Sequence, residues 1–394
     1  MQPSPTARTA RTAPTAPTAP TSPIAPVALA ALALILLSAC GTGEGAAASS
    51  GGPGPAPLRV PALGAVPDLP QWADDPTTPE KTQLGAYVFF DVRLSGSGHT
   101  NCDACHGHQV FFQDNLPTAT PDRSYPNDTP KLHRNSLSFY NIVYAPVFRW
   151  DGSHTDLVDV MAFPFSEANM NLGADVPSAQ VGLKKRLTAD VPAYLPLFQQ
   201  AFGEDLTKLD PPAVWRLTGR ALRAFVRKAV SRDSAFDRWN AGDDTAMSDA
   251  AVRGIGLFQG KGRCITCHTG PFLTDFSFHN LSTSPPGAGG ARADEGRYLI
   301  TKKEEDRGKF LTPTLRQTYM TEPYFHDGSA TSLRTVLAHL NGAMVTADPN
   351  HDPVFNTALG LSAADIDDLV ELMGAMRGTD AVDYSIVPPP AGTP

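Results

Sequence analysis

The chain has 394 residues, of which 18% are charged, and its formal net charge at pH 7 is −8. This length allows two domains, each with a sizeable core. The acidic balance argues against a nucleic-acid-binding protein, because such proteins use an excess of Lys and Arg to hold the phosphate backbone. A basic redox partner is compatible with it.

The N-terminal residues have the pattern of an export signal. Arg8 and Arg11 precede an apolar run over residues 27–37, which is too short to cross a bilayer as a stable helix. The run ends in small residues and Cys40, which resembles the lipobox of bacterial lipoproteins. We therefore predict a signal peptide over residues 1–39, cleaved before Cys40, with a lipid on the Cys40 thiol. A plain signal peptide followed by a chance cysteine is the alternative.

The stretch after Cys40 is dominated by Gly, Ala, Ser and Pro and carries almost no charge. We predict a flexible tether over residues 40–65. Together with the lipobox, this tether predicts a periplasmic lipoprotein anchored to a membrane, with the outer membrane favoured.

Two copies of the pattern C-x-x-C-H stand out in the rest of the chain, Cys102-Asp103-Ala104-Cys105-His106 and Cys264-Ile265-Thr266-Cys267-His268. This pattern is the attachment sequence for c-type haem. Its two thiols can add to the two vinyl groups of one porphyrin, and the histidine then lies beneath the ring as the proximal iron ligand. We predict two covalent haems, with His106 and His268 each binding one iron.

Two other kinds of site use a C-x-x-C pair. One is a zinc site with four cysteines or with two cysteines and two histidines, and the other is a free redox dithiol. Both copies here have His at the same offset, and the two pairs lie far apart. Apart from these four cysteines, no Cys follows Cys40. These facts and the predicted export favour haem.

The remaining pattern is mainly helical. Apolar residues recur at helical spacing in four segments, and no run alternates as a strand would. Ser362 and Asp365 form an N-terminal capping pattern for the last of these helices, and Gly378 is its predicted stop. We predict helices over residues 178–201, 212–230, 332–340 and 362–377, and loops over 115–130, 283–296 and 345–355.

Each C-x-x-C-H lies in its own half, and residues 237–243 read as the join. We predict an N-terminal haem domain over residues 66–240 and a C-terminal haem domain over 241–390. Each half also carries an aromatic-rich Asp-Gly turn, one around Trp150 and one around His326, which suggests that the two domains are related.

Several further short sequence motifs resemble those of the di-haem cytochrome c peroxidase family, which also contains MauG-like protein-oxidising enzymes. The resemblance covers roughly residues 80–380 and rests on Leu84-Gly85, Arg134-Asn135-Ser136, Trp150-Asp151-Gly152, Gly296-Arg297-Tyr298, Glu305-Asp306-Arg307-Gly308-Lys309-Phe310, Thr312-Pro313-Thr314-Leu315-Arg316 and Tyr324-Phe325-His326-Asp327-Gly328-Ser329. It implies a mainly α fold with two cytochrome-c-like haem domains, long loops and a site between the domains.

The resemblance implies a peroxidase that reduces H2O2 to water. Electrons from a small c-type cytochrome or a cupredoxin would enter at the His268 haem and reach the His106 haem by way of Trp150. On its residue type alone, Trp150 reads as a large core aromatic. The alternatives are a MauG-like oxidase that acts on a Trp or Tyr of a protein or peptide, and a non-catalytic electron carrier or sensor. The family leaves a homodimer open, although nothing in the sequence marks an interface.

The chain departs from the family at the sixth ligand of the C-terminal haem. Members place Met there, or Tyr in the MauG-like branch, eight residues after the Ser or Thr that opens the following helix. Counting from Ser332 gives Leu340, which cannot bind iron. Met344 is a candidate replacement ligand, with ordinary packing as its alternative, and His339 is the other nearby donor.

A second departure concerns the proton-transferring carboxylate of the peroxide site. The family glutamate falls at Asn171, whose amide cannot carry a proton at pH 7. Glu167 is the candidate substitute, with a solvated surface carboxylate as its alternative. His133 is the nearest candidate for a resting-state ligand of the N-terminal haem.

The family also has a calcium ion between the haems. By the resemblance, Asn135 would supply a side-chain oxygen and the backbone near Thr312 and Thr314 would supply carbonyls. Such oxygen-only ligation suits Ca²⁺.

Overall fold

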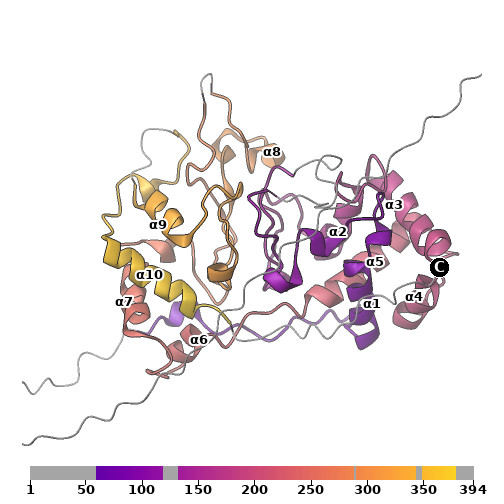
Figure 1. The fold of residues 1–394 in the computed structure, drawn as a ribbon, viewed down its shortest axis with the longest axis horizontal. Coiled ribbons are helices and arrows are strands. Elements are labelled where there is room, and N and C mark those ends of the chain that lie inside the picture. Colours follow the sequence, from indigo (N-terminus) through magenta and orange to yellow (C-terminus); the bar gives the residue numbers. More distant parts are fainter. Residues whose placement is uncertain (1–58, 119–131, 288–289, 343–347, 379–394) are drawn as a thin grey trace, which may run out of the picture. The chain divides into compact units, whose positions relative to one another are not determined.

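The computed structural model describes residues 59–118, 132–287, 290–342 and 348–378. These residues are mainly helical, as predicted (Figure 1). Their α-helices are α1 (Pro79–Phe90), α2 (Leu157–Ala162), α3 (Val176–Lys185), α4 (Tyr194–Phe202), α5 (Pro211–Val226), α6 (Ala235–Asn240), α7 (Asp249–Gln259), α8 (Tyr298–Thr301), α9 (Leu333–Asn341) and α10 (Ala363–Ala375). None of the described helices combines the length and apolar character needed to cross a membrane.

Two very short strands are the sheet content of the described residues. The strands β1 (Phe278–His279) and β2 (Phe310–Leu311) pair antiparallel, with Phe278 opposite Leu311. The described parts of the three predicted loops hold no α-helix or strand.

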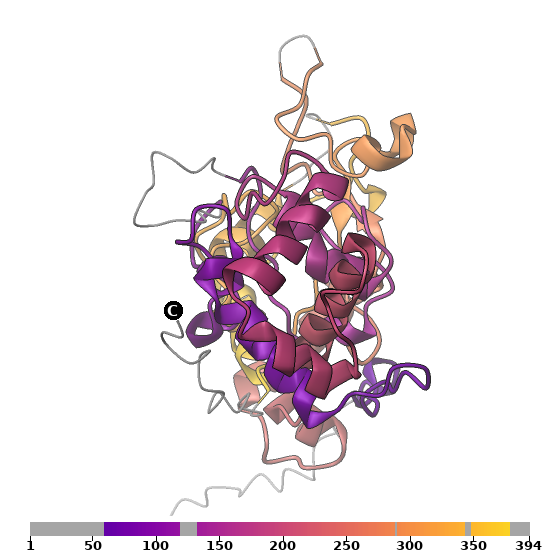
Figure 2. The same cartoon turned by 90° about the vertical axis from the view of Figure 1, so that its right-hand side faces the viewer.

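The N-terminal core forms where α1, α2 and α3 pack on α5. Asp210 caps α5 by accepting a hydrogen bond from the amide of Ala213 at 2.9 Å, and two prolines occupy its first turn. Its apolar face, which includes Val214, Ala221 and Phe225, is buried. The helix predicted over 212–230 therefore exists, and it ends at Val226. In Figure 2 the indigo-to-magenta helices of this half are at the front.

The C-terminal core forms where α7 and α9 pack on α10. Ser362 and Asp365 make the predicted capping box at the start of α10. The helix ends at Ala375, before the predicted stop at Gly378. Ser332 caps α9, which confirms the helix predicted over 332–340.

The single helix predicted over residues 178–201 is wrong, because the segment is broken. Helix α3 runs into a π-turn over Arg186–Asp190, and α4 starts only at Tyr194. Pro192 explains the break, since proline disfavours helical backbone at the residue before it. Val191 accordingly leaves the helical region, with φ −132° and ψ 66°.

The predicted join over residues 237–243 begins inside a helix. Helix α6 buries Phe236 and Trp239 in the C-terminal core. Val60 and Leu63, from the end of the predicted tether, are buried in the same core, so folded structure begins by residue 59. The domain boundary at residues 240 and 241 stays a prediction.

Candidate functional site

The two C-x-x-C-H segments fold into the same local turn. Cys102–Ala104 (η3) and Cys264–Thr266 (η8) are single 3-10 turns. In each turn the carbonyl of the first cysteine accepts the amide of the histidine at 2.9 Å. The cysteines at both turns form no disulfide among the described residues. The turn therefore brings two thiols and one imidazole together twice, as covalent haem attachment requires.

The two histidines are oriented in the same way. The Nδ1 atom of His106 donates to the Phe112 carbonyl at 3.3 Å, and Nδ1 of His268 donates to the Leu273 carbonyl at 2.9 Å. Such a bond fixes the ring and leaves Nε2 as the nitrogen that could bind a metal. Burial lowers the pKa of His106 to about 4 and also lowers the pKa of His268, which keeps both imidazoles in the neutral form that binds iron. These residues fit a haem at each turn.

The first cysteine of each pair differs from an exposed thiol. Burial raises the pKa of Cys102 and of Cys264 to about 12. A buried neutral thiol is a poor redox nucleophile, because the thiolate is the reactive form. For Cys102 and Cys264 this counts against the free-dithiol alternative.

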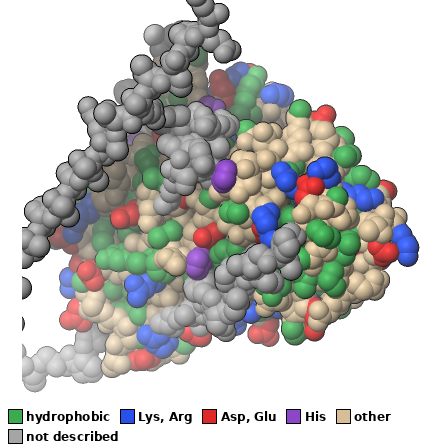
Figure 3. Space-filling model, turned by 45° about the vertical axis from the view of Figure 1, so that its right-hand side comes forward, with side chains coloured by type: hydrophobic (Ala, Val, Ile, Leu, Met, Phe, Trp, Pro, Cys, Tyr) green, Lys and Arg blue, Asp and Glu red, His purple; other side chains and the backbone are tan. Residues whose placement is uncertain are grey.

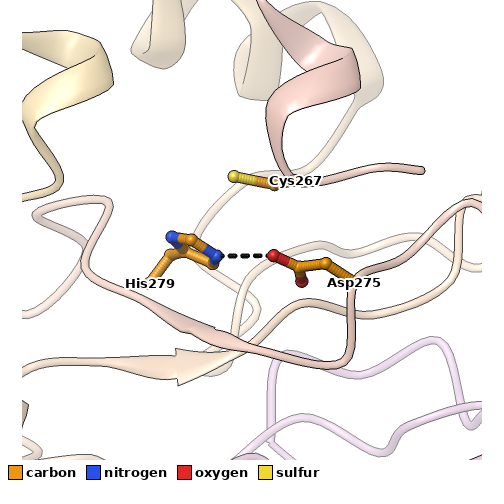
Figure 4. Close-up of side chains that lie close together, drawn as sticks. All are labelled: Cys267, Asp275 and His279. Carbon is orange, nitrogen blue, oxygen red and sulfur yellow. Dashed lines mark hydrogen bonds and ion pairs between the residues drawn. The ribbon is translucent and has the colours of Figure 1, made fainter.

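Sequence reasoning missed a polar cluster beside the second turn. Figure 4 shows Cys267, Asp275 and His279 close together, with ligand atoms within 4.8 Å of one another. His279 is hydrogen-bonded by Asp275 at 2.9 Å and by Asp352 at 2.5 Å. The hydrogen bond with Asp352, followed by one with Cys267, raises the pKa of His279 to about 11.

This set of one Cys, one His and one Asp differs from the four-cysteine and the two-cysteine, two-histidine sites of the zinc alternative. A thiolate, an imidazole and a carboxylate are ordinary zinc ligands. The same Cys267 sulfur would form a thioether bond to a haem, so zinc and haem exclude each other here. The i, i+4 spacing of Asp275 and His279 was the only local signal of the cluster.

Trp150 lies where the two halves of the chain meet. Its indole Nε1 donates to the Asn135 carbonyl at 2.9 Å, and its own carbonyl accepts from the Leu311 amide at 2.8 Å. The Asn135 amide donates in turn to the His326 carbonyl at 2.6 Å. The structure thus brings Trp150 and Asn135 together beside Leu311, which directly precedes Thr312.

Charged groups surround this junction. Arg134 bonds Asp151 at 2.7 Å and Asp294 at 2.6 Å. Arg297 donates to the carbonyls of Asp151 and Gly152, both at 2.8 Å. Burial acts to raise the pKa of Asp151 and Asp294, but their hydrogen bonds, above all those from Arg134, outweigh it and both pKa values are lowered. Both aspartates are therefore ionised at neutral pH.

The oxygens proposed for calcium already take part in hydrogen bonds. Asn135 Oδ1 accepts from Gln113 at 3.5 Å. The Thr312 carbonyl accepts from the Thr274 hydroxyl at 2.7 Å, and the Thr314 carbonyl accepts from the Thr318 hydroxyl at 2.9 Å. A carbonyl oxygen has two lone pairs, so each keeps one for a cation.

The two residues considered for proton transfer differ in their surroundings. Glu167 is partly buried and bonds Arg149, the neighbour of Trp150, at 2.7 Å. Asn171 is exposed, with φ +46°. The backbone amide of Asn171 donates to the Glu167 carbonyl at 2.7 Å.

The remaining candidates are less informative. His339 uses Nε2 to contact the Leu281 carbonyl at 2.7 Å, and His133 is exposed. Leu340 is partly buried against the C-terminal core. Met344 and Cys40 lie outside the described residues.

Comparison with known proteins gives consistent matches. A sequence profile described as di-haem cytochrome c peroxidase matches residues 79–245. Cytochrome-c peroxidase IdrP1 of Denitromonas iodatirespirans is 33% identical over 349 residues, which cover 82% of this chain and 88% of that protein. Methylamine utilization protein MauG of Methylorubrum extorquens is 35% identical over 272 residues, with 69% of this chain and 71% of MauG covered.

The fold is also similar to that of solved structures. A MauG-like protein associated with microbial copper homeostasis matches with a TM-score of 0.70 and 24% identity, covering 82% of this chain and 96% of that chain. This likeness supports the mainly helical fold.

Proposed function

Because the chain belongs to the di-haem cytochrome c peroxidase family, a family of oxidoreductases with two c-type haems, we propose that it reduces H2O2 to water with electrons from a small c-type cytochrome or a cupredoxin. Two electrons and two protons convert one H2O2 into two waters. The observation that carries the proposal is the repeated C-x-x-C-H turn with its Nδ1-anchored histidine.

The haem residues take the following roles. Cys102, Cys105, Cys264 and Cys267 form thioether bonds, while His106 and His268 bind iron. When bound, the haems supply the redox chemistry. The chain fixes their axial histidines through the Phe112 and Leu273 carbonyls.

Trp150 is an aromatic group at the junction of the two halves. The indole donates to the Asn135 carbonyl, the Trp150 backbone carbonyl accepts from the Leu311 amide, and the side chain is buried. A fixed aromatic ring in this place suits electron transfer between the haems.

Glu167 is the proposed proton-transfer group. A carboxylate can take a proton and return it, whereas the Asn171 amide can only hydrogen-bond. The ion pair with Arg149 holds Glu167 near the Trp150 turn. Asn171 would then donate a hydrogen bond without exchanging a proton.

Further parts of the proposal concern calcium, the sixth ligand and location. Asn135, Thr312 and Thr314 would hold one Ca²⁺ with oxygen ligands. Met344 is the proposed sixth ligand of the C-terminal haem. The chain would act in the periplasm as a lipoprotein, anchored through lipid on Cys40.

The test uses the purified full chain. Haem and zinc contents are measured, and then H2O2-dependent oxidation of a reduced c-type cytochrome is followed. We expect two haems, no zinc and rapid turnover. Replacing Cys102 and Cys105 by Ser, or Cys264 and Cys267 by Ser, should remove one of the two haems in each case. Zinc in place of iron would overturn the haem assignment, and two haems without peroxide consumption would indicate an electron carrier.

A MauG-like oxidase is the second candidate. The 35% identity to MauG and the absence of Met at position 340 favour it, whereas the absence of Tyr at that position counts against it. Such an enzyme withdraws electrons from a Trp or Tyr of a protein substrate. Slow oxidation of the cytochrome, together with H2O2-dependent loss of fluorescence from a tryptophan-containing peptide, would establish this reading and exclude the peroxidase.

A further inference from the structure

A hydroxyl group lies behind each of the two proximal histidines. The Ser138 hydroxyl donates to the Phe111 carbonyl at 2.7 Å. Phe111 is the residue directly before Phe112, whose carbonyl accepts from Nδ1 of His106. Ser138 therefore holds the short segment that orients this imidazole.

The C-terminal half repeats this arrangement. The Thr314 hydroxyl donates to the Phe272 carbonyl at 2.5 Å. Phe272 directly precedes Leu273, whose carbonyl accepts from Nδ1 of His268. Both hydroxyls also accept the amide two residues further on, Tyr140 at 3.4 Å in one half and Arg316 at 3.1 Å in the other.

The chain around the two hydroxyls has the same register. Three residues after each hydroxyl, Asn141 and Gln317 adopt left-handed backbone with φ +62° and +64°. Each of them opens a 3-10 turn, over Ile142–Tyr144 and Thr318–Met320. The Asp-Gly turns that follow close with matching bridges, Phe148 to His154 and Tyr324 to Ala330. Ser138 and Thr314 are thus equivalent positions of two related half-structures.

From this equivalence, and resting on the haem assignment of the proposed function, we infer that Ser138 and Thr314 are paired positioning residues. Each hydroxyl bonds the carbonyl of the residue directly before the one whose carbonyl accepts from the proximal histidine. By holding that loop, it influences the reduction potential of its own haem. A firm Nδ1–H···O=C bond makes the imidazole a stronger donor to iron, which stabilises the ferric state. Loss of the hydroxyl should loosen that bond and raise the potential of one haem.

The loops that carry the Phe112 and Leu273 carbonyls differ in their hydrogen bonds and ring contacts. In the C-terminal half the Leu315 amide also donates to the Leu273 carbonyl at 3.3 Å, and Arg316 donates to the Pro271 carbonyl at 2.6 Å. In the N-terminal half, Phe139 instead stacks on the His106 ring at 4.0 Å between centroids. The histidine bond is shorter where the loop has more contacts, 2.9 Å against 3.3 Å. The same hydroxyl position can therefore tune two haems differently.

The experiment compares Ser138→Ala with Thr314→Val in the full haem-loaded protein. Haem content and the midpoint potential of each haem are measured by spectroelectrochemistry. We expect two haems per chain in both variants, with an upward shift of the His106 haem alone in Ser138→Ala and of the His268 haem alone in Thr314→Val. Each variant is thus the control for the other haem.

Conservative and nearby substitutions complete the design. Ser138→Thr and Thr314→Ser keep the hydroxyl and should restore the original potentials. Thr318→Val removes a hydroxyl that donates to the Thr314 carbonyl rather than to the loop, and should shift neither potential. With two haems bound, unchanged potentials in Ser138→Ala and Thr314→Val would overturn this inference alone. A wild-type protein without haem would overturn the proposed function as well.

Discussion

At the scale of single residues, Trp150 combines a polar and an apolar role. The indole is buried, yet its nitrogen has a definite partner in the Asn135 carbonyl. An indole that only filled space could satisfy its one N–H donor with any nearby acceptor. Here the partner is Asn135, whose own amide donates to the His326 carbonyl, so the ring is fixed relative to both Asp-Gly turns.

Replacing Trp150 by Phe should lower peroxide turnover at least tenfold while both haems stay attached. Phenylalanine keeps much of the packing but loses the hydrogen bond to Asn135 and the more easily oxidised indole. The lost bond should also reduce the free energy of unfolding by about 1–2 kcal/mol. Steady-state kinetics and a haem assay on the same preparation measure both effects.

The matched control is Trp215→Phe, which changes a buried tryptophan of α5 outside the junction. It should lower stability with little change in turnover per haem. Equal losses of turnover in the two variants would show that Trp150 serves packing only.

The residues open to sequence reasoning were those with local spacing rules. The cysteines and histidines of a C-x-x-C-H turn lie within five consecutive positions, so their grouping needs no knowledge of the fold. Thr314 and Phe272, or His279 and Asp352, are far apart in the chain and meet only after folding. No period or motif in a single sequence reports such pairs.

At the scale of elements, glycine sets how closely the main helix pairs approach. A Cβ atom at Gly85 of α1 would lie 1.9 Å from the Ala221 carbonyl oxygen of α5, and one at Gly254 of α7 would lie 2.5 Å from that of Asp368 in α10. Both distances are too short for any side chain. The two cores therefore share one construction, a helix before the C-x-x-C-H turn packed closely on a later helix.

Gly254→Ala should lower the free energy of unfolding by roughly 1–3 kcal/mol, because α7 must move away from α10. Gly256, two residues further along α7, faces open space. Gly256→Ala should instead raise stability by about 0.5–1 kcal/mol, since alanine is the better helix former. Urea denaturation followed by circular dichroism compares the two. A similar effect of both substitutions would contradict close packing at Gly254.

Helix prediction succeeded for α5, α9 and α10, and for α10 the predicted capping pattern agreed with the apolar period. It failed at residues 178–201, where the apolar period continues through Pro192 although the backbone cannot. The apolar pattern indicates which side of the segment is buried. It does not indicate whether that side belongs to one continuous helix or to two. A proline inside a long periodic segment was the available signal of the break.

At the scale of the whole described chain, the halves are joined by partly buried polar contacts as well as by the backbone. Arg134 in the first half bonds Asp294 in the second, and Arg297 returns a bond to the Asp151 carbonyl. On the face drawn in Figure 3, basic and acidic side chains are interspersed over the described residues. The distribution of charge therefore does not single out one docking site for an electron donor on that face. The ion pairs of Arg134 lie at the junction of the two halves.

Arg134→Met should weaken this junction. The substitution leaves Asp151 and Asp294 without their guanidinium partner, and removing one partner of largely buried pairs should cost about 2 kcal/mol, allowing for their partial exposure. Arg334→Met is the control, because its pair with Asp367 is exposed and should contribute at most about 0.5 kcal/mol.

The effect of Arg134 should also depend on pH in a defined direction. Arg134 lowers the pKa of both aspartates, so its contribution to stability is present above the unfolded aspartate pKa of about 3.9. It is lost as the pH falls through the lowered pKa values of the folded state. Wild type and Arg134→Met should therefore differ in urea denaturation at pH 7 and converge as the solution is acidified. A difference that persists unchanged in acid would mean that Arg134 stabilises the junction by packing rather than by charge.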